Sequence, residues 1–382
     1  MKIEAILLSL AKSARSFIFT SLAITIPYFL SNLNLSPFQI GIVILLSLAI
    51  STAFLYIYTV LRIMAKEKLL LMASLFLISL ILLYLNENLV FLLIALIVGA
   101  FSLSGRDLTA NQSIEQYTLS LHAENQDQKN AIFSVYNFGS YMSGALASLF
   151  LFAYNPSTFQ FVFLLNVILA IFQLAIYLYI KFPKFIPKKK GEKIRDQKTR
   201  SLVKNLAVLF SVDSIGGGLV NNSIITLFFK IVYNLDISQV GFIFILVNII
   251  TAFSVIVSKY ISGSIGLVRT MVYTHIVSNI LLFMVPVFHS LVISEIFLFM
   301  RQSTSQMDVP ARDSFVNTVI PEDARVESNS VFIGVRNGMQ IPGPGIAGLL
   351  MEIFPAGVFF GAALTKISYD IAFFLKYRDD RT

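Results

Sequence analysis

Ionisable side chains stand inside long apolar stretches of this sequence, where they could exchange protons or bind polar solutes. Asp213 lies within the apolar interval 205–230, in "SVDSIGGGLVNNSII", and has no basic residue one turn away on its own helix. A carboxylate in such surroundings resists ionisation unless a cation compensates it, and that property suits a group that takes up and releases a proton. The sequence predicts Asp213 as a proton-coupling residue, with a structural ion pair to Arg15 as the alternative and Glu115 as the second candidate.

A second set of charges follows an apolar stretch in "RQSTSQMDVPARDSF", residues 301–315. Arg301, Asp308 and Arg312 are spaced so that a continuous helix would place all three on one face. Asp308 would then have two cationic neighbours. We predict that Asp308 and Arg312 belong to a structural or gating network and that Arg301 faces a solute cavity.

Further polar residues occupy other apolar stretches. Arg106 and Asp107 are adjacent in sequence and face different directions, so each needs a partner on another helix. Tyr136 and Asn137 in one stretch share register with Arg336 and Asn337 in another, which indicates either a polar lining or hydrogen bonds between helices. The predicted cavity residues are Arg15, Arg106, Arg301, Arg336, Asn137, Asn221 and Gln340. The predicted gating or structural network is Asp107, Asp308, Arg312 and Arg325.

We predict structural roles for Lys366, Asp370 and His275. Lys366 and Asp370 lie one turn apart and could neutralise each other. His275 is expected to be packed in the interior. The three histidines are too scattered for a metal site, and the chain has no cysteine. Since no phosphate-binding loop, zinc motif or nucleophile elbow is present, we expect neither a cofactor nor an enzyme.

The elements that must position these groups are membrane-spanning helices. Of the 382 residues, 56% are hydrophobic and 13% are charged, with a mean hydropathy of +0.78. Apolar runs of about 20 residues, each long enough to cross a bilayer as a helix, recur along the chain. The predicted spans are 8–31, 38–61, 67–85, 89–112, 130–153, 158–181, 205–230, 238–260, 266–286, 290–312, 329–351 and 355–377.

The long polar interval of the chain, 183–204, predicts a cytoplasmic linker. It is mostly basic and cannot bury enough apolar surface to fold alone. It would separate an N-terminal six-helix bundle, 1–182, from a C-terminal one, 205–382. The net charge of +8 collects in this linker and in short loops, which indicates topology instead of nucleic-acid binding. We expect both termini to be cytoplasmic.

The two halves repeat each other. "NLSPFQIGIVILLSLAIS" begins at Asn34 and "NLDISQVGFIFILVNIIT" begins at Asn234. A second match pairs 132–149 with 331–349, and it aligns Gly139 with Gly338 and Gly144 with Gly343. Such parallel repeats place a substrate path between the halves, near the membrane midplane. Pro344, within "PGPGIAGLL", predicts a packing or bending point of the eleventh span.

Twelve spans in two sets of six, joined by a basic linker, resemble the major facilitator superfamily of secondary transporters. The resemblance covers the whole chain and is sharpest in 301–350 and in "GRDLTANQSIEQYTLS", 105–120. It implies an all-α integral membrane protein that moves a small organic solute by alternating access, either facilitatively or coupled to protons or other ions. The loop before the third span lacks the Asp and both glycines of the family motif, and the fifth span lacks the antiporter signature. These departures leave antiport weakly supported.

Other functional classes remain open at this stage. A transporter-like sensor or scaffold would move no solute, and an integral-membrane enzyme could act on lipid. The expected partners are a small-molecule substrate, the lipid bilayer and a coupling proton, with no nucleic acid. We expect a monomer in the plasma membrane.

Overall fold

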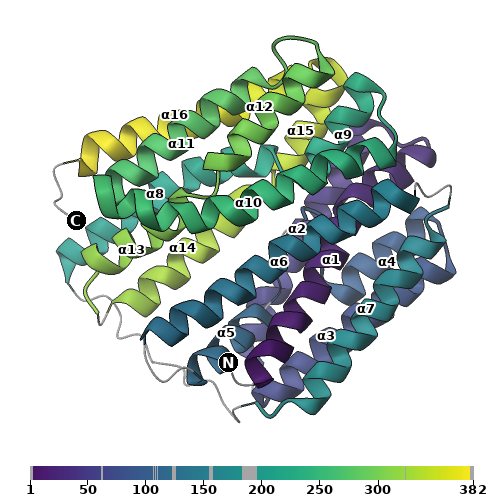
Figure 1. The fold of residues 1–382 in the computed structure, drawn as a ribbon, viewed down its shortest axis with the longest axis horizontal. Helices are drawn as coiled ribbons and strands as arrows, with labels where there is room; N and C mark the ends of the chain where they lie inside the picture. The colour runs from purple at the N-terminus through teal and green to yellow at the C-terminus, as the bar shows by residue number, and fades with distance from the viewer. Residues whose placement is uncertain are drawn as a thin grey trace. The chain divides into compact units, whose positions relative to one another are not determined.

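The computed structural model describes residues 3–61, 63–105, 107, 109, 111–122, 126–154, 158–182, 196–322 and 324–378 (Figure 1). These residues form α-helices joined by turns and short loops, with no strand among them. Arg106 and residues 183–195 of the predicted linker lie outside the described residues. The chain divides into two compact units, Met1–Pro187 with Asn222–Asn248, and Lys188–Asn221 with Ile249–Thr382.

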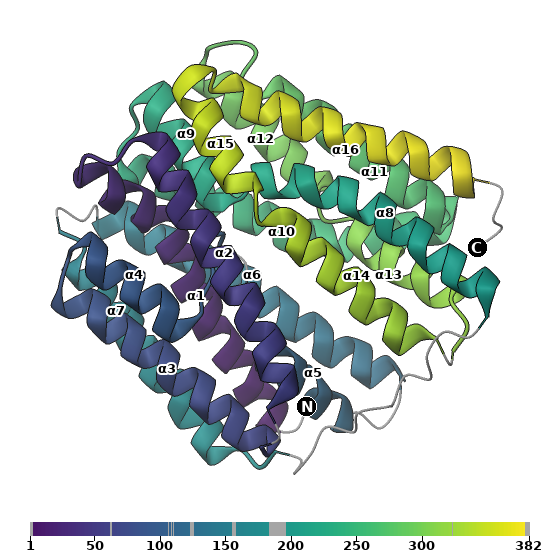
Figure 2. The same cartoon turned by 180° about the vertical axis from the view of Figure 1, so that it is seen from behind.

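The first unit holds the N-terminal helices and a segment from later in the chain (Figure 2). Its helices are α1 (Ile3–Asn32), α2 (Pro37–Val60), α3 (Ala65–Leu85), α4 (Leu89–Gly99), α5 (Asn111–Leu121), α6 (Gln126–Tyr154), α7 (Gln160–Tyr179), α9 (Asn222–Tyr233) and the start of α10 (Ile237–Ile265). The α9 segment is joined to α1 by a hydrogen bond from the Ser223 hydroxyl to the Ala23 carbonyl, at 3.0 Å.

The second unit holds the remaining helices. They are α8 (Gln197–Leu219), the rest of α10, α11 (Leu267–Met284), α12 (Leu291–Thr304), α13 (Asp308–Val319), α14 (Arg325–Gln340), α15 (Gly343–Ile353) and α16 (Ala356–Tyr377). The sequence predicts 222–248 within the bundle 205–382, whereas the compact units group it with the N-terminal helices. The bundle boundaries stay a prediction.

Each of the twelve predicted spans contains helix, but α5 lies almost wholly beyond the predicted end at residue 112, and most of α13 lies beyond the predicted end at residue 312. Four of the spans are interrupted. The interrupted spans consist of the pairs α4 and α5, α8 and α9, α12 and α13, and α14 and α15. By length and composition, eight helical segments of the described chain are able to cross a membrane, and α8 with α9 counts as one of them. The predicted spans outside this group are α4–α5, α6, α12–α13 and α14–α15. Many of the polar residues predicted to have a functional or structural role lie in these four spans.

The sequence repeat has a local structural cause at the start of α2 and of α10. Ser36 caps α2: its hydroxyl accepts from the Gln39 N–H at 3.4 Å, and the Gln39 side chain accepts from the Ser36 N–H at 2.9 Å. Asp236 and Gln239 make the same reciprocal pair before α10, at 2.8 and 3.0 Å. Asn34 and Asn234 both adopt left-handed backbone conformations two residues earlier. The repeated motif is therefore a turn followed by a capping box.

The break between α4 and α5 removes a stretch of helix from a predicted span. Ala100 ends α4 in the left-handed region, and Gly105 has a φ of +79°. A Cβ on Gly105 would lie 2.9 Å from the Cβ of Asn222, so the turn requires glycine for both conformation and space. The break places Asp107 and Thr109 on non-helical backbone.

The glycines of α8 permit backbone contact with the α14–α15 break, inside the second unit. A Cβ on Gly218 would lie 2.5 Å from the Gln340 carbonyl oxygen, and one on Gly343 would lie 2.2 Å from the Gly218 carbonyl carbon. The sequence predicts a packing or bending point at Pro344; the structure has a break in the eleventh span just before it, between Gln340 and Gly343. Pro344 follows in the first turn of α15, where a missing N–H costs no helical hydrogen bond.

Candidate functional site

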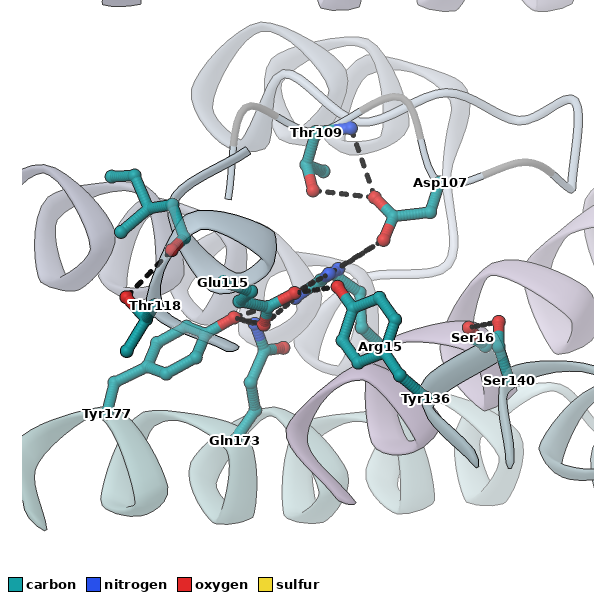
Figure 3. A network of polar contacts seen from close by, with 11 residues as sticks. Arg15, Ser16, Asp107, Thr109, Glu115, Thr118, Tyr136, Ser140, Gln173 and Tyr177 are labelled. Carbon is teal, nitrogen blue, oxygen red and sulfur yellow. Dashed lines mark hydrogen bonds and ion pairs between the residues drawn. The ribbon is translucent and has the colours of Figure 1, made fainter. Parts of the chain in front are cut away.

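Arg15 lies at the centre of a buried ion-pair cluster in the first unit (Figure 3). Its side chain, on α1, has no exposed surface. The guanidinium Nε donates to Asp107 Oδ2 at 2.7 Å, while Nη1 and Nη2 donate to the two oxygens of Glu115 at 2.9 and 2.7 Å. This forked contact uses the planar geometry that distinguishes arginine from lysine.

Glu115 is surrounded by donors. Besides Arg15, it accepts hydrogen bonds from the hydroxyl of Tyr136 at 2.5 Å and from the hydroxyl of Tyr177 (Figure 3). Gln173 in turn donates to the Tyr177 oxygen at 3.0 Å. Glu115 has no exposed surface. These four donor contacts use both oxygens of the carboxylate, and the two from Arg15 are charge-assisted.

The second carboxylate of this cluster, Asp107, is also satisfied. It accepts from the backbone N–H of Thr109 at 3.1 Å and from the Thr109 hydroxyl at 2.6 Å. Lys12, one turn before Arg15, places its ammonium 4.6 Å from the centre of the Tyr136 ring. We name Lys12, Arg15, Asp107 and Glu115 the Arg15 cluster. It contains two basic and two acidic side chains, so their formal charges cancel.

A second buried cluster, in the second unit, is built around Asp213. The Lys366 ammonium, on α16, donates to Asp213 Oδ1 at 2.6 Å. Arg312 Nη1, on α13, lies 3.9 Å from Asp213 Oδ2 and donates to Asp308 at 3.0 Å. Asp213 is 6% exposed. Two cations from two other helices therefore compensate this carboxylate.

His275, on α11, connects Asp213 to a further carboxylate. Its Nδ1 lies 2.7 Å from Asp370 Oδ1, and its Nε2 lies 3.6 Å from Asp213 Oδ1. Asn279, one turn along α11, donates to the other oxygen of Asp370 at 3.2 Å. We name Asp213, His275, Asp308, Arg312, Lys366 and Asp370 the Asp213 cluster.

Three of the predicted arrangements are wrong. Asp213 is not an uncompensated carboxylate, and its partner is not Arg15, which binds Asp107 and Glu115 instead. Lys366 and Asp370 do not pair with each other, because Lys366 contacts α8 and Asp370 contacts α11. His275 is buried as expected, yet both its nitrogens face carboxylates.

The predicted pair of Asp308 and Arg312 is confirmed, but the third member of that face is not. The turn between α12 and α13 interrupts the helix, so the spacing from Arg301 no longer places it on the same face. Arg301 Nη1 contacts Gln302 Oε1 at 3.1 Å. Arg325 donates from Nε to the Ile320 carbonyl at 3.1 Å and closes the loop between α13 and α14.

Arg336, on α14, stands out among the predicted cavity residues. It makes no hydrogen bond and no ion pair with any described residue, and its Nε is buried. It interacts electrostatically with Arg312 and with Asp313, which lies beside Arg312 in the sequence. Gln340, one turn along α14, and Asn137, on α6, are half-buried. Asn221 is buried between α8 and α9, and Arg106 lies outside the described residues.

Sequence reasoning missed Lys12, Gln173 and Tyr177 as members of the polar interior. A signal for Lys12 was present, because it lies one turn before Arg15 inside an apolar run. Tyr177 and Gln173 lie in a strongly apolar helix, α7, whose hydropathy matches that of a lipid-facing span. Only the packing of α7 against α1 shows that these two side chains point inward.

Comparison with known proteins agrees with the fold. The family model of the Major Facilitator Superfamily matches residues 8–344. An uncharacterised membrane protein of Saccharomyces cerevisiae is 27% identical over 166 residues, which are 43% of this chain and 37% of the yeast protein. The chain thus matches little more than a third of that relative's length.

Solved structures extend the similarity to the whole chain. The nucleoside transporter NupG superposes with a TM-score of 0.75 and 15% identity, over 98% of this chain and 100% of NupG. A POT family transporter solved with a thioalcohol-conjugated peptide gives a TM-score of 0.75 and 12% identity, over 98% of this chain and 96% of its own. At these identities the similarity shows a shared fold.

Proposed function

This chain belongs to the Major Facilitator Superfamily and is a transmembrane solute transporter, and we propose that it moves a small organic solute that binds Arg336 through an acceptor oxygen. Transport proceeds by alternating access, in which the solute site opens to one side of the membrane at a time. The proposed solute site is inferred from the chemistry of Arg336.

The observation that supports this proposal is the unpaired guanidinium of Arg336. A charged group within a membrane span costs several kcal/mol unless it is paired or faces water, so an arginine with no protein partner is a binding-site candidate. Guanidinium has donors and no acceptor, and it does not lose its proton in proteins. The solute must therefore present a carbonyl, carboxylate or phosphate oxygen.

Nearby groups support the same assignment. Arg312 Nε is also buried and has no hydrogen-bond partner among the described residues, whereas its Nη1 binds Asp308. The carboxylates of Asp213 and Asp308 already have cationic partners. Free donor capacity therefore remains on the two arginines, where a solute oxygen can use it. Gln340, one turn from Arg336, can add an amide contact.

The solute assignment is tested with the purified protein and a panel of probes: uridine, dialanine and benzoate. We expect at least one probe to raise the melting temperature and to enter proteoliposomes, and Arg336→Gln to abolish both effects. Arg325→Gln is the matched control, because Arg325 binds a backbone carbonyl in a loop. A probe that enters equally well with Arg336→Gln would refute the role of Arg336. Binding without entry of any probe would instead favour the sensor or scaffold.

The orientation is part of the proposal: both termini and the linker are cytoplasmic, and the protein works as a monomer in the plasma membrane. The clustering of basic residues in 183–204 supports the orientation. Since the chain has no cysteine, Ser201→Cys and Glu87→Cys each introduce a single exposed thiol. An impermeant reagent added to intact cells should label the cysteine at 87 and spare the one at 201. The reverse pattern would invert the topology.

A lipid-acting enzyme has less support. Among the described residues, no group of three or more His, Cys, Asp or Glu side chains is arranged to hold a metal ion. The buried carboxylates are occupied by cations and tyrosines. The arrangement favours stable charge pairing inside each unit and leaves Arg336 as the group available to a ligand.

A further inference from the structure

The His275 imidazole lies between two carboxylates, one at each ring nitrogen. Nδ1 is 2.7 Å from Asp370 Oδ1, a hydrogen-bond distance, and Nε2 is 3.6 Å from Asp213 Oδ1, within ion-pair range. A neutral imidazole has one N–H and one lone pair. Its lone pair would then point at a negatively charged oxygen on one side or the other. The imidazolium, which has an N–H on each nitrogen, suits both carboxylates; the Asn279 amide nitrogen also lies 3.3 Å from Nδ1.

With all three carboxylates ionised, the charges along the Asp213 cluster alternate when His275 is protonated. The contacts run from Asp370 to His275, from His275 to Asp213, and from Asp213 to Lys366 and Arg312; Arg312 then binds Asp308. Three carboxylates face two permanent cations, so the ion-paired groups sum to −1 with neutral imidazole and to zero with imidazolium. Arg336 and Asp313, which lie beside the cluster outside its ion pairs, cancel each other in this count.

The groups that face His275 come from several helices. From α16 come Asp370, Lys366 and the ring of Tyr369, whose centre is 5.9 Å from that of the imidazole. From α8 comes Asp213, and from α13 comes Asp308, which acts at longer range. The α12 helix also packs on α11, and its ionisable residues are Glu295 and Arg301. Negative groups lie closest to the ring, and Lys366 is already bound to Asp213.

We propose that the His275–Asp370 pair is the proton-binding site of this transporter. This inference rests on the proposed transport function and names the coupling ion as a proton. The proton resides on His275, where it joins α11 to α16 through Asp370 and to α8 through Asp213. When the proton leaves, the Nε2 or Nδ1 lone pair faces a carboxylate, and the cluster holds an uncompensated buried negative charge. That change weakens the contact of α11 with its neighbours and favours the alternative state of the transport cycle.

The protonation state of His275 can be measured without any solute. The chain has three histidines, so the variant with His122→Gln and His289→Gln retains His275 as its one histidine. Neither replaced residue belongs to the Asp213 cluster. In nanodiscs at neutral pH, ¹⁵N NMR of this variant should show both ring nitrogens protonated. Adding Asp370→Asn should convert the signal to a neutral imidazole. A neutral imidazole in the parent variant would overturn the proposal.

The coupling role is tested in proteoliposomes with whichever probe the wild-type protein transports. His275→Gln should lose accumulation driven by a pH gradient and retain exchange of labelled for unlabelled probe. His275→Lys keeps a permanent positive charge and the balance of the cluster, so it should fold well and also lose pH-driven accumulation. Full pH-driven accumulation by either variant would refute the coupling site. If no probe crosses with any variant, the transport function fails, whereas the NMR result still decides the protonation state.

Discussion

The Arg15 cluster and the Asp213 cluster occupy comparable interiors but are neutralised by different means. In the Arg15 cluster, Arg15 contacts both carboxylates, Thr109 adds donors to Asp107, and Glu115 alone receives four donor contacts. In the Asp213 cluster, one of three carboxylates lies within hydrogen-bond distance of an imidazole, a group that exists in a neutral and a protonated form. The difference shows why similar buried charges in the two units need not share a function. The first cluster pairs its carboxylates with an arginine and hydroxyl donors, whereas the second also contains an imidazole.

The two glycines paired by the sequence repeat, one in each unit, pack differently. Gly144, in α6, faces side chains: an added Cβ would lie 2.9 Å from Asn248 Oδ1 and 3.0 Å from Thr20 Oγ1. Gly343, its partner in the repeat, faces the backbone of Gly218. Side chains can rotate away from a new methyl group, whereas backbone can move only with its helix. Of these two positions, Gly343 therefore tolerates an added methyl group less well.

The largest expected effect comes from removing the central cation of the first cluster. Arg15→Gln leaves Glu115 and Asp107 buried without their main partner, and the loss of one side of a buried ion pair costs about 3–5 kcal/mol. We expect the folded yield and the melting temperature to fall sharply. Arg325→Gln, which loses one contact to a loop carbonyl, is the control and should change little.

The same experiment contains its own rescue. Arg15→Gln combined with Glu115→Gln removes the cation together with one carboxylate, so it should recover part of the lost stability. An unchanged melting temperature of Arg15→Gln would show that Arg15 does not stabilise the two carboxylates. The Arg15 cluster would then no longer differ from the Asp213 cluster in how its carboxylates are stabilised.

A smaller effect is expected from the tyrosine donors of the first cluster. Tyr177→Phe removes a hydroxyl that donates to the ionised Glu115, and such a bond is worth about 1.5–3 kcal/mol. Tyr58→Phe is the matched control, because the buried Tyr58 hydroxyl has no hydrogen-bond partner among the described residues. Chemical or thermal unfolding of both variants measures the difference. Equal stability of the two would show that the hydroxyls do not stabilise the carboxylate.

Substitutions of Gly343 and Gly144 should change the free energy of unfolding by a similar or smaller amount than Tyr177→Phe. Gly343→Ala places a methyl group against the α8 backbone and should cost about 1–3 kcal/mol, the range for overpacking. Gly144→Ala should cost less, since Asn248 and Thr20 can move. Melting temperatures of the two variants give the comparison. A larger loss for Gly144→Ala would contradict the assignment of the more rigid contact to Gly343.

The smallest effect concerns an exposed carboxylate that serves as a reference for both clusters. Asp196 caps α8, and hydrogen bonds from the backbone N–H of Thr199 and of Lys198, with one from the Thr199 hydroxyl, lower the pKa of its carboxyl group. Because the pKa is lower in the folded state, the cap stabilises α8 at neutral pH, and this stabilisation is lost as the pH falls through the folded-state pKa.

Amide exchange at the first turn of α8 measures this cap. We expect the protection of these amides, corrected for the intrinsic exchange rate, to fall at acid pH in the wild-type protein. Asp196→Asn, which keeps an acceptor oxygen without the charge, should remove this pH dependence. An unchanged pH dependence in Asp196→Asn would show that the carboxylate does not stabilise this end of α8.

Much of the architecture could be predicted from local sequence. Apolar runs locate the twelve spans, and the matching of 34–51 with 234–251 reflects one turn and capping box used twice. The ion pair of Asp308 with Arg312 was also predictable, because both groups lie one turn apart in a single helix. Helical breaks were less visible. The break after Gly99 and the turn before Asp308 interrupt stretches that hydropathy treats as continuous.

What the sequence by itself determined is the set of helices, their repeat and the identity of the charges placed inside them, because these depend on interactions between residues near one another in the chain. The pairing of those charges was decided by tertiary structure. Arg15 meets Glu115 across 100 residues, and Lys366 meets Asp213 across 153. Such pairs depend on which helix faces lie together, and helical spacing does not encode that. Packing alone turned Asp213 from an isolated carboxylate into a compensated one, and placed His275 between two carboxylates.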